Sequence, residues 1–375
     1  MAVQKETGRV SSAELARLRE KLGQEVRVAD PPYLTELTRD AIRHWAWGIG
    51  DRNPLYLDEE YARSAVGSLI GPPTILYAFS RLAIGYRGGL PGVHSMFGGS
   101  DWLWRRPLRV GEQIRARVVF KDLVELQSRF AGRTWKQLSE ISFTTTDGEE
   151  VAKAESWGLR MERTSAREGR KYSYLEQKTY EPEEIEALAR AYENETCRGA
   201  VPLYWDDVGV GTDVPSLVRG PYTPTIAVAF EQGWGGLFVR AHGYWFDYLA
   251  RHPAAGMLNQ YGVPEPPEAV HWDSELARSV GVPAAYDYGP ERISWIATML
   301  TNWIGDRGRL NRLYCEIRRF NVVGDLTTCG GSVTGKREDG GGDGIVELSI
   351  WAEDHRGEQT VKGSAEVLLP KRPPA

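Results

Sequence analysis

Three side chains of this sequence combine a residue type and a setting suited to acid–base chemistry. Asp51 follows a glycine and stands five positions before Tyr56, and His271 stands in a second segment, two positions before an aspartate. A carboxylate or an imidazole can take up a proton near neutral pH, whereas a phenol donates a hydrogen bond but rarely ionises there. Structural roles stay open for two of them: Asp51 as a turn or cap residue, and His271 as a buried brace.

Other kinds of catalytic centre are not indicated by the sequence. It contains no Rossmann glycine pattern, no G-x-S-x-G nucleophile elbow and no complete phosphate-binding loop of the G-x-x-x-x-G-K-[ST] type. No group of histidine, cysteine and acidic residues has metal-ligand spacing. Cys197, Cys315 and Cys329 form no C-x-x-C pair, so we expect free thiols in a reducing compartment and no metal site.

Composition and charge are those of an ordinary globular protein. The chain has 375 residues, 46 of them basic and 51 acidic, and a net charge of −5. This composition excludes collagen-like, disordered and small disulfide-rich classes, and a mildly acidic chain is not expected to bind nucleic acid or an anionic membrane. No apolar stretch is long enough for a transmembrane helix, and the polar N-terminus lacks a signal-peptide core. We therefore expect a cytoplasmic protein.

The two candidate segments belong to an internal repeat. Three pairs of similar segments occur in the same order, each pair roughly 210 positions apart. The pairs are 57–64 with 272–279, 105–112 with 318–325, and 147–150 with 356–359. In this alignment Tyr56 corresponds to His271, and Asp51 corresponds to Pro266. Asp58 corresponds to Asp273, and we expect both to cap helices.

Each copy of the repeat shows the same order of elements. Two prolines open an apolar helix expected over 74–86, and helical spacing of apolar residues predicts its counterpart over 290–304. Strands joined by hairpin turns follow in both copies. We expect them at 113–121, 139–145, 151–161, 327–336, 345–353 and 360–369. This order suggests a sheet wrapped around a helix in each copy.

The segment 48–58, G-I-G-D-R-N-P-L-Y-L-D, carries a family resemblance. It resembles the motif Gly-Asp-x-Asn-Pro-x-His-x-Asp of MaoC-like (R)-specific enoyl-CoA hydratases and acyl dehydratases, and the N-terminal half is most similar to fatty-acid-synthase-type dehydratases. The resemblance implies an α+β protein with two tandem hotdog folds, each a curved antiparallel sheet around a central helix. The expected parts are an arm (1–25), an N-terminal hotdog (26–161), a linker (162–200) and a C-terminal hotdog (201–375) with an aromatic insertion near 233–268.

The resemblance implies reversible addition of water to a 2-enoyl thioester, with Asp51 as the general base. Asn53 would brace the motif loop. The sequence departs from the family because Tyr56 stands where the motif has histidine, while the second copy keeps His271 and lacks the acid. Either Tyr56 or His271 would complete the site, and the second option requires the two copies to bring His271 within one bridging water of Asp51.

Hydration of a thioester also needs hydrogen-bond donors for the thioester oxygen. Free N–H groups at a helix start can hold a developing oxyanion, and the resemblance points to Thr74 and Gly289 at such starts. Candidates for contacts to the phosphates of coenzyme A or of a carrier protein are Arg105, Arg106, Arg318 and Arg319. Coenzyme A would be part of the substrate, so no separate cofactor is expected.

Two other functions stay open at this point. The divided Asp and His pattern is also what a non-catalytic acyl-binding subunit would show, and such a subunit would pair with a catalytic hotdog subunit. A hotdog thioesterase could use Asp51 to activate water. Two hotdogs in one chain already supply the pairing that single hotdogs reach by dimerising, and further assembly, as a homo-oligomer or with a second hotdog subunit, stays open.

Overall fold

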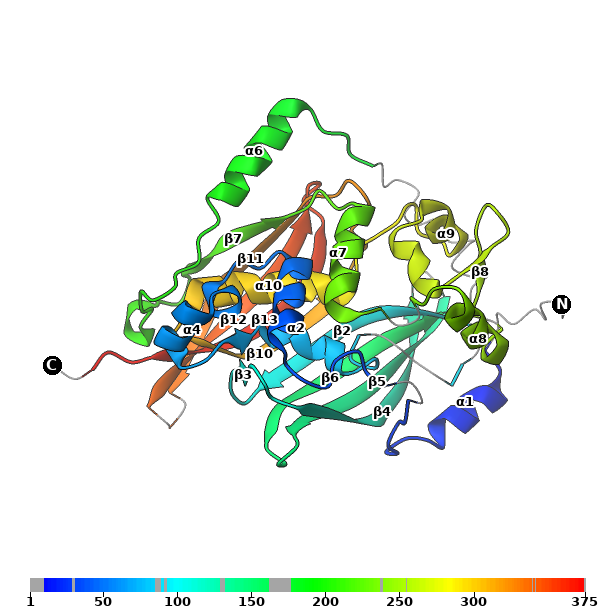
Figure 1. Cartoon of the computed structure of the whole chain (residues 1–375), viewed down its shortest axis with the longest axis horizontal. Coiled ribbons are helices and arrows are strands. Elements are labelled where there is room, and N and C mark those ends of the chain that lie inside the picture. Colours follow the sequence, from blue (N-terminus) through cyan, green and yellow to red (C-terminus); the bar gives the residue numbers. More distant parts are fainter. Residues whose placement is uncertain are drawn as a thin grey trace.

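The strands of both copies join into one antiparallel sheet (Figure 1). The computed structural model describes residues 10–28, 31–84, 89–90, 93–128, 132–161, 177–236, 239–253, 255–338, 340 and 342–373. Over these residues the main sheet has nine strands in the order β4-β5-β6-β2-β10-β13-β12-β11-β7. The first copy contributes β2 (His94–Trp104), β4 (Ile114–Ser128), β5 (Gly132–Thr145) and β6 (Glu150–Met161). The second contributes β7 (Asp213–Arg219), β10 (Arg309–Ile317), β11 (Thr327–Glu338), β12 (Asp343–Asp354) and β13 (Gln359–Pro370).

The two copies meet where β2 pairs with β10. Tyr314 stands opposite Asp101 in this antiparallel ladder, and Arg312 forms an ion pair with Asp101 at 2.6 Å. Gly99 has a φ of +144°, and a Cβ there would lie 2.2 Å from the Cys315 carbonyl oxygen. Only glycine therefore permits the strands to approach this closely.

The expected hairpin strands are confirmed, although most extend further than their alternating patterns indicate. The sequence patterns do not indicate β2 or β10. The segment that forms β2 contains adjacent glycines and lacks strict alternation of polarity, so no period-two pattern marks it as a strand. The sheet is thus continuous where the sequence suggests two separate halves.

The central helix of the second copy is confirmed as α10 (Gly289–Ile304), and all its residues from 290 to 304 are buried. The long α-helix expected over 74–86 is wrong over its described part. The chain forms a 3₁₀ helix, η1 (Pro73–Phe79), which ends where Ser80 becomes extended. The Pro73 carbonyl accepts a hydrogen bond from Trp104 Nε1 at 3.0 Å, so tertiary contacts replace part of the α-helical pattern.

A matching pair of helices, one from each copy, packs one against the other, and the first of them also contacts α10. These are α2 (Arg39–Ile49) and α7 (Pro224–Trp234). A Cβ at Gly48 would lie 2.9 Å from the Ala229 carbonyl oxygen, so this glycine lets the helices touch. The short helices α3 (Pro54–Leu57) and α4 (Glu59–Val66) follow in the first copy, and α9 (Ser274–Ser279) is the counterpart of α4 in the second. Asp58 and Asp273 cap α4 and α9 through their side chains, as expected from the repeat.

The arm, linker and insertion surround this frame. In the arm, α1 (Ser12–Arg19) buries two leucines against the first copy's strands. The linker forms α6 (Pro182–Glu193), which has no buried residue and stands away from the sheet in Figure 1; residues 162–176 lie outside the described residues. The remaining short elements are β1 (Ile70–Gly71), β3 (Leu108–Arg109), η2 (Trp205–Asp207), α8 (Gly243–Arg251), β8 (Met257–Leu258), β9 (Pro264–Glu265) and η3 (Pro267–His271).

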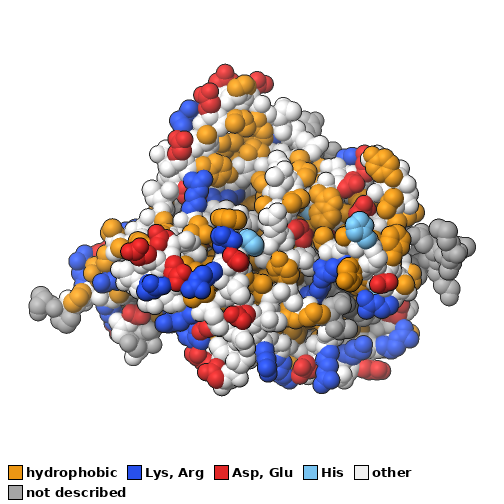
Figure 2. All heavy atoms as spheres, in the orientation of Figure 1, with side chains coloured by type: hydrophobic (Ala, Val, Ile, Leu, Met, Phe, Trp, Pro, Cys, Tyr) orange, Lys and Arg blue, Asp and Glu red, His pale blue; other side chains and the backbone are white. Residues whose placement is uncertain are grey.

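The surface agrees with the mixed charge of the sequence. Acidic and basic side chains are interspersed over the face shown in Figure 2. Among the described helices, none has the length and apolar character needed to cross a membrane.

Candidate active site between the two copies

Asp51 lies buried at the end of α2, in contact with the central helix of the other copy. Gly50 ends α2 in the left-handed conformation (φ 69°), which turns the chain so that the Asp51 side chain points inward. The residue is 3% exposed. One carboxylate oxygen, Oδ1, accepts the Asn53 N–H at 2.9 Å, and Oδ2 accepts the Thr298 hydroxyl at 2.8 Å. Both oxygens are therefore held in one orientation, one of them by α10.

The surroundings of Asp51 make it a stronger base than an exposed aspartate. Burial raises the pKa of this carboxyl, and the hydrogen bonds from Asn53 and Thr298 and the nearby Arg219 charge partly oppose that effect. A carboxylate whose pKa moves toward the working pH is a more effective general base.

Asp51 lines a pocket of about 550 Å³ with walls from three parts of the chain. The end of α2 forms one side, Tyr192 and Glu195 of the linker form another, and the second copy contributes Glu291 and Trp295 of α10. The pocket exists only because the two copies and the linker meet here.

Arg219, at the end of β7, holds the loop that carries Asp51. Its guanidinium donates to Glu195 at 2.8 and 3.0 Å and to the Gly50 carbonyl oxygen at 2.9 Å. The side chain of Arg219 is only 6% exposed, so the ion pair is buried. No motif marks Arg219 or Glu195 in the sequence, and their importance appears only when β7 and the linker lie beside the motif loop.

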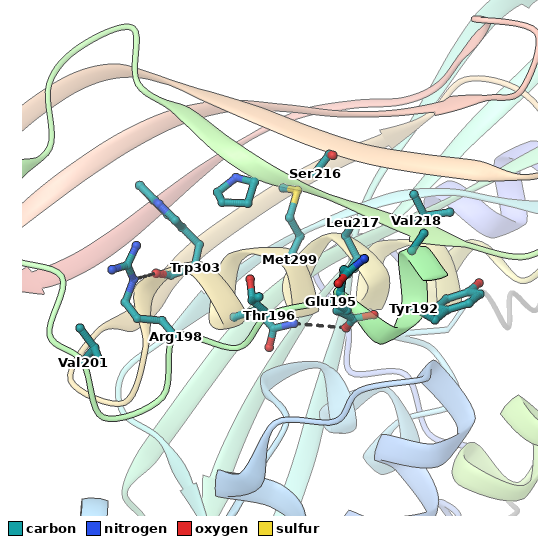
Figure 3. A pocket seen from close by; sticks show the side chains of 14 residues that line it. Tyr192, Glu195, Thr196, Arg198, Val201, Ser216, Leu217, Val218, Met299 and Trp303 are labelled. Atoms are coloured by element: carbon teal, nitrogen blue, oxygen red, sulfur yellow. Dashed lines mark hydrogen bonds between the residues drawn. The ribbon is translucent and has the colours of Figure 1, made fainter. Parts of the chain in front are cut away.

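A second groove, of about 730 Å³, adjoins the Asp51 pocket (Figure 3). The two share Tyr192 and Glu195, so the linker borders both. Met299 and Trp303 of α10 point into the groove toward β7. Arg198 of the linker donates to the Trp303 carbonyl oxygen at 2.6 Å and so ties the linker to the end of α10.

Tyr56 lies near enough to Asp51 to feel the charge of its carboxylate, and it lines a smaller cavity. It is 3% exposed, and burial, followed by the Asp51 charge, raises its pKa well above 10, which keeps the phenol neutral. The cavity that it lines measures about 70 Å³ and is also bordered by Asn53 and Thr301. Asn53 caps α3, since its Oδ1 accepts the Leu55 N–H at 3.0 Å, which is the bracing position expected for it.

His271 lies beside Tyr288 at the start of α10, whereas Thr298 lies past the midpoint of that helix. Its Nδ1 is 2.7 Å from the Tyr286 carbonyl oxygen, and its ring stacks on Tyr288 with centroids 3.7 Å apart. Burial lowers the pKa of His271 to about 4, so the ring is neutral near pH 7. Tyr288 and Thr298 are ten residues apart on α10, or about 15 Å along the helix axis. The structure therefore does not bring His271 together with Asp51.

The two expected oxyanion positions are both enclosed. Thr74 is fully buried and accepts a hydrogen bond from Trp45 Nε1 at 3.3 Å. A Cβ on Gly289 would lie 2.4 Å from the Phe97 ring, which covers the start of α10. Their role as donors to a thioester oxygen stays a prediction.

Relatives of known sequence match about a third of the chain. A UPF0336 protein of Thermobifida fusca (strain YX) is 32% identical over 139 residues, which are 36% of this chain and 86% of the relative. One from Parafrankia sp. (strain EAN1pec) is 32% identical over 130 residues, 33% of this chain and 82% of the relative. The chain belongs to the UPF0336 family.

Two further comparisons concern the dehydratase resemblance and the fold of this UPF0336 protein. Residues 27–154 match the family described as "FAS1-like, dehydratase domain region". A MaoC-like dehydratase structure covers 94% of this chain and 100% of its own, with a TM-score of 0.64 and 17% identity. A Mycobacterium tuberculosis protein with a double hotdog fold has a TM-score of 0.53 and 10% identity, covering 92% and 96%. These matches confirm the resemblance and the tandem hotdog fold.

In this UPF0336 protein the paired arginines form ion pairs at equivalent turns of the two copies. In the first copy, Arg106 pairs with Glu149 at 2.7 Å and Arg105 with Glu150 at 3.2 Å. In the second, Arg318 pairs with Glu316 at 3.2 Å.

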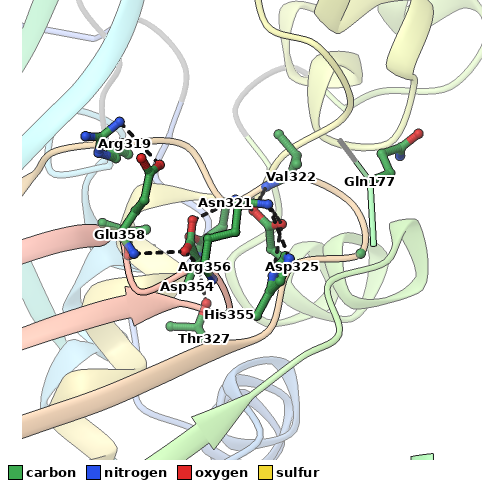
Figure 4. A network of polar contacts seen from close by, with 12 residues as sticks. Gln177, Arg319, Asn321, Val322, Asp325, Thr327, Asp354, His355, Arg356 and Glu358 are labelled. Carbon is green, nitrogen blue, oxygen red and sulfur yellow. Dashed lines mark hydrogen bonds and ion pairs between the residues drawn. The ribbon is translucent and has the colours of Figure 1, made fainter. Parts of the chain in front are cut away.

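Figure 4 shows the corresponding network of the second copy. Arg319 lies 3.3 Å from Glu358, and Arg356 binds Asp325 and Asp354 at 2.8 and 2.6 Å. The Arg-Arg segment thus contacts the Gly-Glu segment in each copy. This structural contact accounts for the occurrence of both segments in both copies. Their contact with a substrate phosphate stays a prediction.

Metal-binding groups do not occur among the described residues of this UPF0336 protein. No cluster of three or more histidine, cysteine and acidic side chains is close enough to hold an ion there. The three cysteines are free thiols; Cys315 and Cys329 are buried, and Cys197 is partly buried.

Proposed function

We propose that this protein catalyses the reversible addition of water to a 2-enoyl thioester, with Asp51 as the general base. The observation that carries the proposal is the Asp51 carboxylate itself. It is buried, oriented by Thr298 and the Asn53 N–H, and lines a pocket formed by both hotdogs and the linker. An oriented carboxylate with a raised pKa in a pocket is the arrangement expected of a proton-accepting residue.

In the hydration direction, Asp51 takes a proton from a water molecule as the water oxygen bonds to C3 of the enoyl group. Negative charge then develops on the thioester oxygen, and C2 receives a proton. In the reverse direction the 3-hydroxyl group leaves as water. A positioned acid or base contributes roughly 10²–10⁴-fold to such a step.

The proposed substrate is a thioester of coenzyme A or of an acyl carrier protein, and we propose that the reaction occurs in the cytoplasm. Coenzyme A would enter as part of the substrate, so no bound cofactor is required.

Absorbance of the conjugated enoyl thioester tests this function. The full chain would be incubated with crotonyl-, long-chain and branched enoyl-CoA, with Asp51→Asn as the matched variant. We expect the wild type to remove the absorbance band of the conjugated thioester. With Asp51→Asn the band should be lost at least 100-fold more slowly. A thiol reagent in the same assay would reveal free coenzyme A, the product expected of a thioesterase. A flat trace across all substrates would refute the hydratase proposal.

A second candidate function is that of a non-catalytic acyl-binding subunit. It is favoured by the hydrogen-bond partners of Asp51, which include no histidine within the described part of the chain. This function predicts no turnover by the chain alone and turnover after a catalytic hotdog subunit is added. Activity of the purified chain alone would exclude it.

A further inference from the structure

Buried polar atoms without hydrogen-bond partners gather around the first turn of α10. They are the Tyr222 hydroxyl, Glu231 Oε2 and Glu291 Oε1. Native proteins leave few such atoms unpaired, and where they cluster they often serve a ligand or a reaction. The proposed mechanism gives none of them a role. Glu291 is the one of the three that also lines the Asp51 pocket.

Glu291 and Asp51 both line that one pocket. Glu291, Trp295 and Thr298 follow one another at intervals of four and three residues, so they share one face of α10. Thr298 binds Asp51 directly, and Glu291 is seven residues earlier, about 10 Å along the helix axis. Tyr56 lines a separate cavity, and His271 does not line the pocket.

The Glu291 side chain is arranged to carry a proton. It is fully buried, and its Oε2 accepts the Tyr288 N–H at 3.4 Å, which leaves Oε1 unpaired. The neighbouring Arg292 charge is engaged by Asp287 at 2.7 Å. Burial, followed by the negative charge of Asp287, raises the pKa of Glu291 well above its ordinary range, which favours the protonated form of the carboxyl.

We propose that Glu291 is the proton donor of the hydration reaction and supplies the function of the histidine that is missing at position 56. This inference rests on the proposed function of Asp51. Asp51 accepts a proton from water while the water oxygen bonds to C3, and the C2=C3 electron pair shifts toward the thioester. The Glu291 O–H bond then breaks and its proton bonds to C2. The proton on Asp51 is lost to solvent and Glu291 regains one, so the net change is addition of one water.

The geometry also predicts the stereochemistry of addition. Two carboxyl groups roughly 6.5–9.5 Å apart can hold a water and a reacting bond between them, as in inverting glycosidases. The backbone positions of Glu291 and of Thr298, which binds Asp51, are about 10 Å apart along α10, so the proposal places the two carboxyls at a separation of this order. In the proposed arrangement the enoyl group lies between Asp51 and Glu291, so the two carboxyls act on opposite faces of the double bond and we expect anti addition. A single acid–base pair that holds one water would give syn addition.

The first test compares Glu291→Gln with Tyr56→Phe in crotonyl-CoA hydration by the full chain. Glutamine keeps the oxygen that accepts the Tyr288 N–H, so the helix cap is retained. We expect kcat to fall 10²–10³-fold in Glu291→Gln and less than threefold in Tyr56→Phe. In the wild type the rate should fall at high pH as Glu291 loses its proton, and this fall should be absent from Glu291→Gln. Full activity of a folded Glu291→Gln variant, or loss confined to Tyr56→Phe, would overturn the inference.

The second test needs no variant. Wild-type hydration of crotonyl-CoA in D₂O gives a 3-hydroxybutyryl thioester with one deuterium at C2, and the proton coupling between C2 and C3 reports the relative configuration. Anti addition supports Glu291, and syn addition overturns its role while leaving Asp51 as the base. Turnover that depends on Asp51 but not on Glu291 refutes only this inference, whereas absence of wild-type turnover refutes both.

Discussion

Thr298 and Asp51 form the central contact of the proposed site. The two residues are 247 positions apart in the sequence, and their hydrogen bond measures 2.8 Å. The threonine hydroxyl orients Asp51 Oδ2 and lowers the pKa of the carboxyl, against the larger effect of burial. Loss of this one hydroxyl group in the second copy should therefore alter the proton affinity of Asp51 in the first copy.

Replacing Thr298 by valine removes this donor while keeping the side-chain shape. We expect kcat at pH 7 to fall about 10-fold, because a buried acceptor loses a hydrogen bond worth ~1–3 kcal/mol. The pKa of Asp51 should rise further, so the ascending limb of the pH profile of kcat/KM should move to higher pH. Thr298→Ser keeps the hydroxyl and should behave like the wild type. Identical pH profiles for the valine variant and the wild type would contradict this prediction.

Glu231 offers a prediction about stability. Burial raises its pKa to about 8, and Tyr288 donates a hydrogen bond to its Oε1. The carboxyl of Glu231 releases its proton near pH 4.5 in the unfolded chain. Between pH 4.5 and 8 the folded protein therefore still holds this proton, whereas the unfolded chain does not. The contribution of this proton to stability is complete below pH 4.5 and declines as the pH rises toward 8.

Glu231→Gln should remove that decline, since an amide does not titrate and can still accept the Tyr288 hydroxyl. Urea unfolding at several pH values should show a flatter dependence in the variant, with a difference on the order of 5 kcal/mol across the range. Glu183→Gln, on the exposed face of α6, is the control and should keep the wild-type slope. Equal slopes for the wild type and Glu231→Gln would show that Glu231 is not protonated in the folded state.

Among the elements, α10, β7 and the linker do most to build the site. Helix α10 supplies Thr298, β7 supplies Arg219, and the linker supplies Glu195. The linker therefore does more than join two domains, because its buried carboxylate neutralises the arginine that binds the Gly50 carbonyl oxygen. Helix η1, the counterpart of α10, is shorter and does not contact Asp51 through any hydrogen bond found in the described residues.

Breaking the Arg219–Glu195 pair from one side should be strongly destabilising. Arg219→Met leaves Glu195 buried without its partner, and we expect a loss of about 3–5 kcal/mol in the free energy of unfolding. The double variant with Glu195→Gln should lose less than the sum of the single variants. An urea double-mutant cycle measures this coupling. The control is Arg190→Met, which removes an exposed ion pair on α6 and should change the free energy of unfolding by less than ~1 kcal/mol. Additive losses for the variants at positions 195 and 219 would contradict the prediction.

In the whole molecule, the two hotdogs share one sheet and one site. The β2–β10 ladder makes the sheet continuous, and the Asp51 pocket takes walls from both copies. Neither copy has a complete site, since the motif loop belongs to the first and its contacts on α10 belong to the second. The tandem arrangement is thus a requirement of the proposed chemistry.

Dividing the chain within the linker tests this requirement. A fragment of residues 1–161 should show no hydration of enoyl-CoA, because it lacks Thr298 and the α10 wall, and the exposed edge of β2 should make it associate. Co-expression with a fragment of residues 177–375 should restore turnover and a 1:1 complex on size-exclusion chromatography. Turnover by the N-terminal fragment alone would show that the second copy is not needed.

Local patterns in the sequence were sufficient for the hairpins, for α10, for the caps at Asp58 and Asp273 and for the hotdog resemblance. These features depend on neighbours in the chain, on spacing of apolar residues and on turn chemistry, so a linear pattern contains them. The length of η1 could not be predicted, because the hydrogen bond from Trp104 to the Pro73 carbonyl oxygen depends on strand β2 lying beside it.

The partners of Asp51 illustrate the remaining gap. The motif identified Asp51 and Asn53 from their spacing, and the repeat identified His271 as the counterpart of Tyr56. Thr298, Arg219 and Glu291 carry no recognisable pattern, because each is an ordinary residue of a buried helix or a strand end. They meet Asp51 or its pocket only after the sheet closes across both copies, when burial and close approach give these side chains their hydrogen bonds and their altered proton affinities.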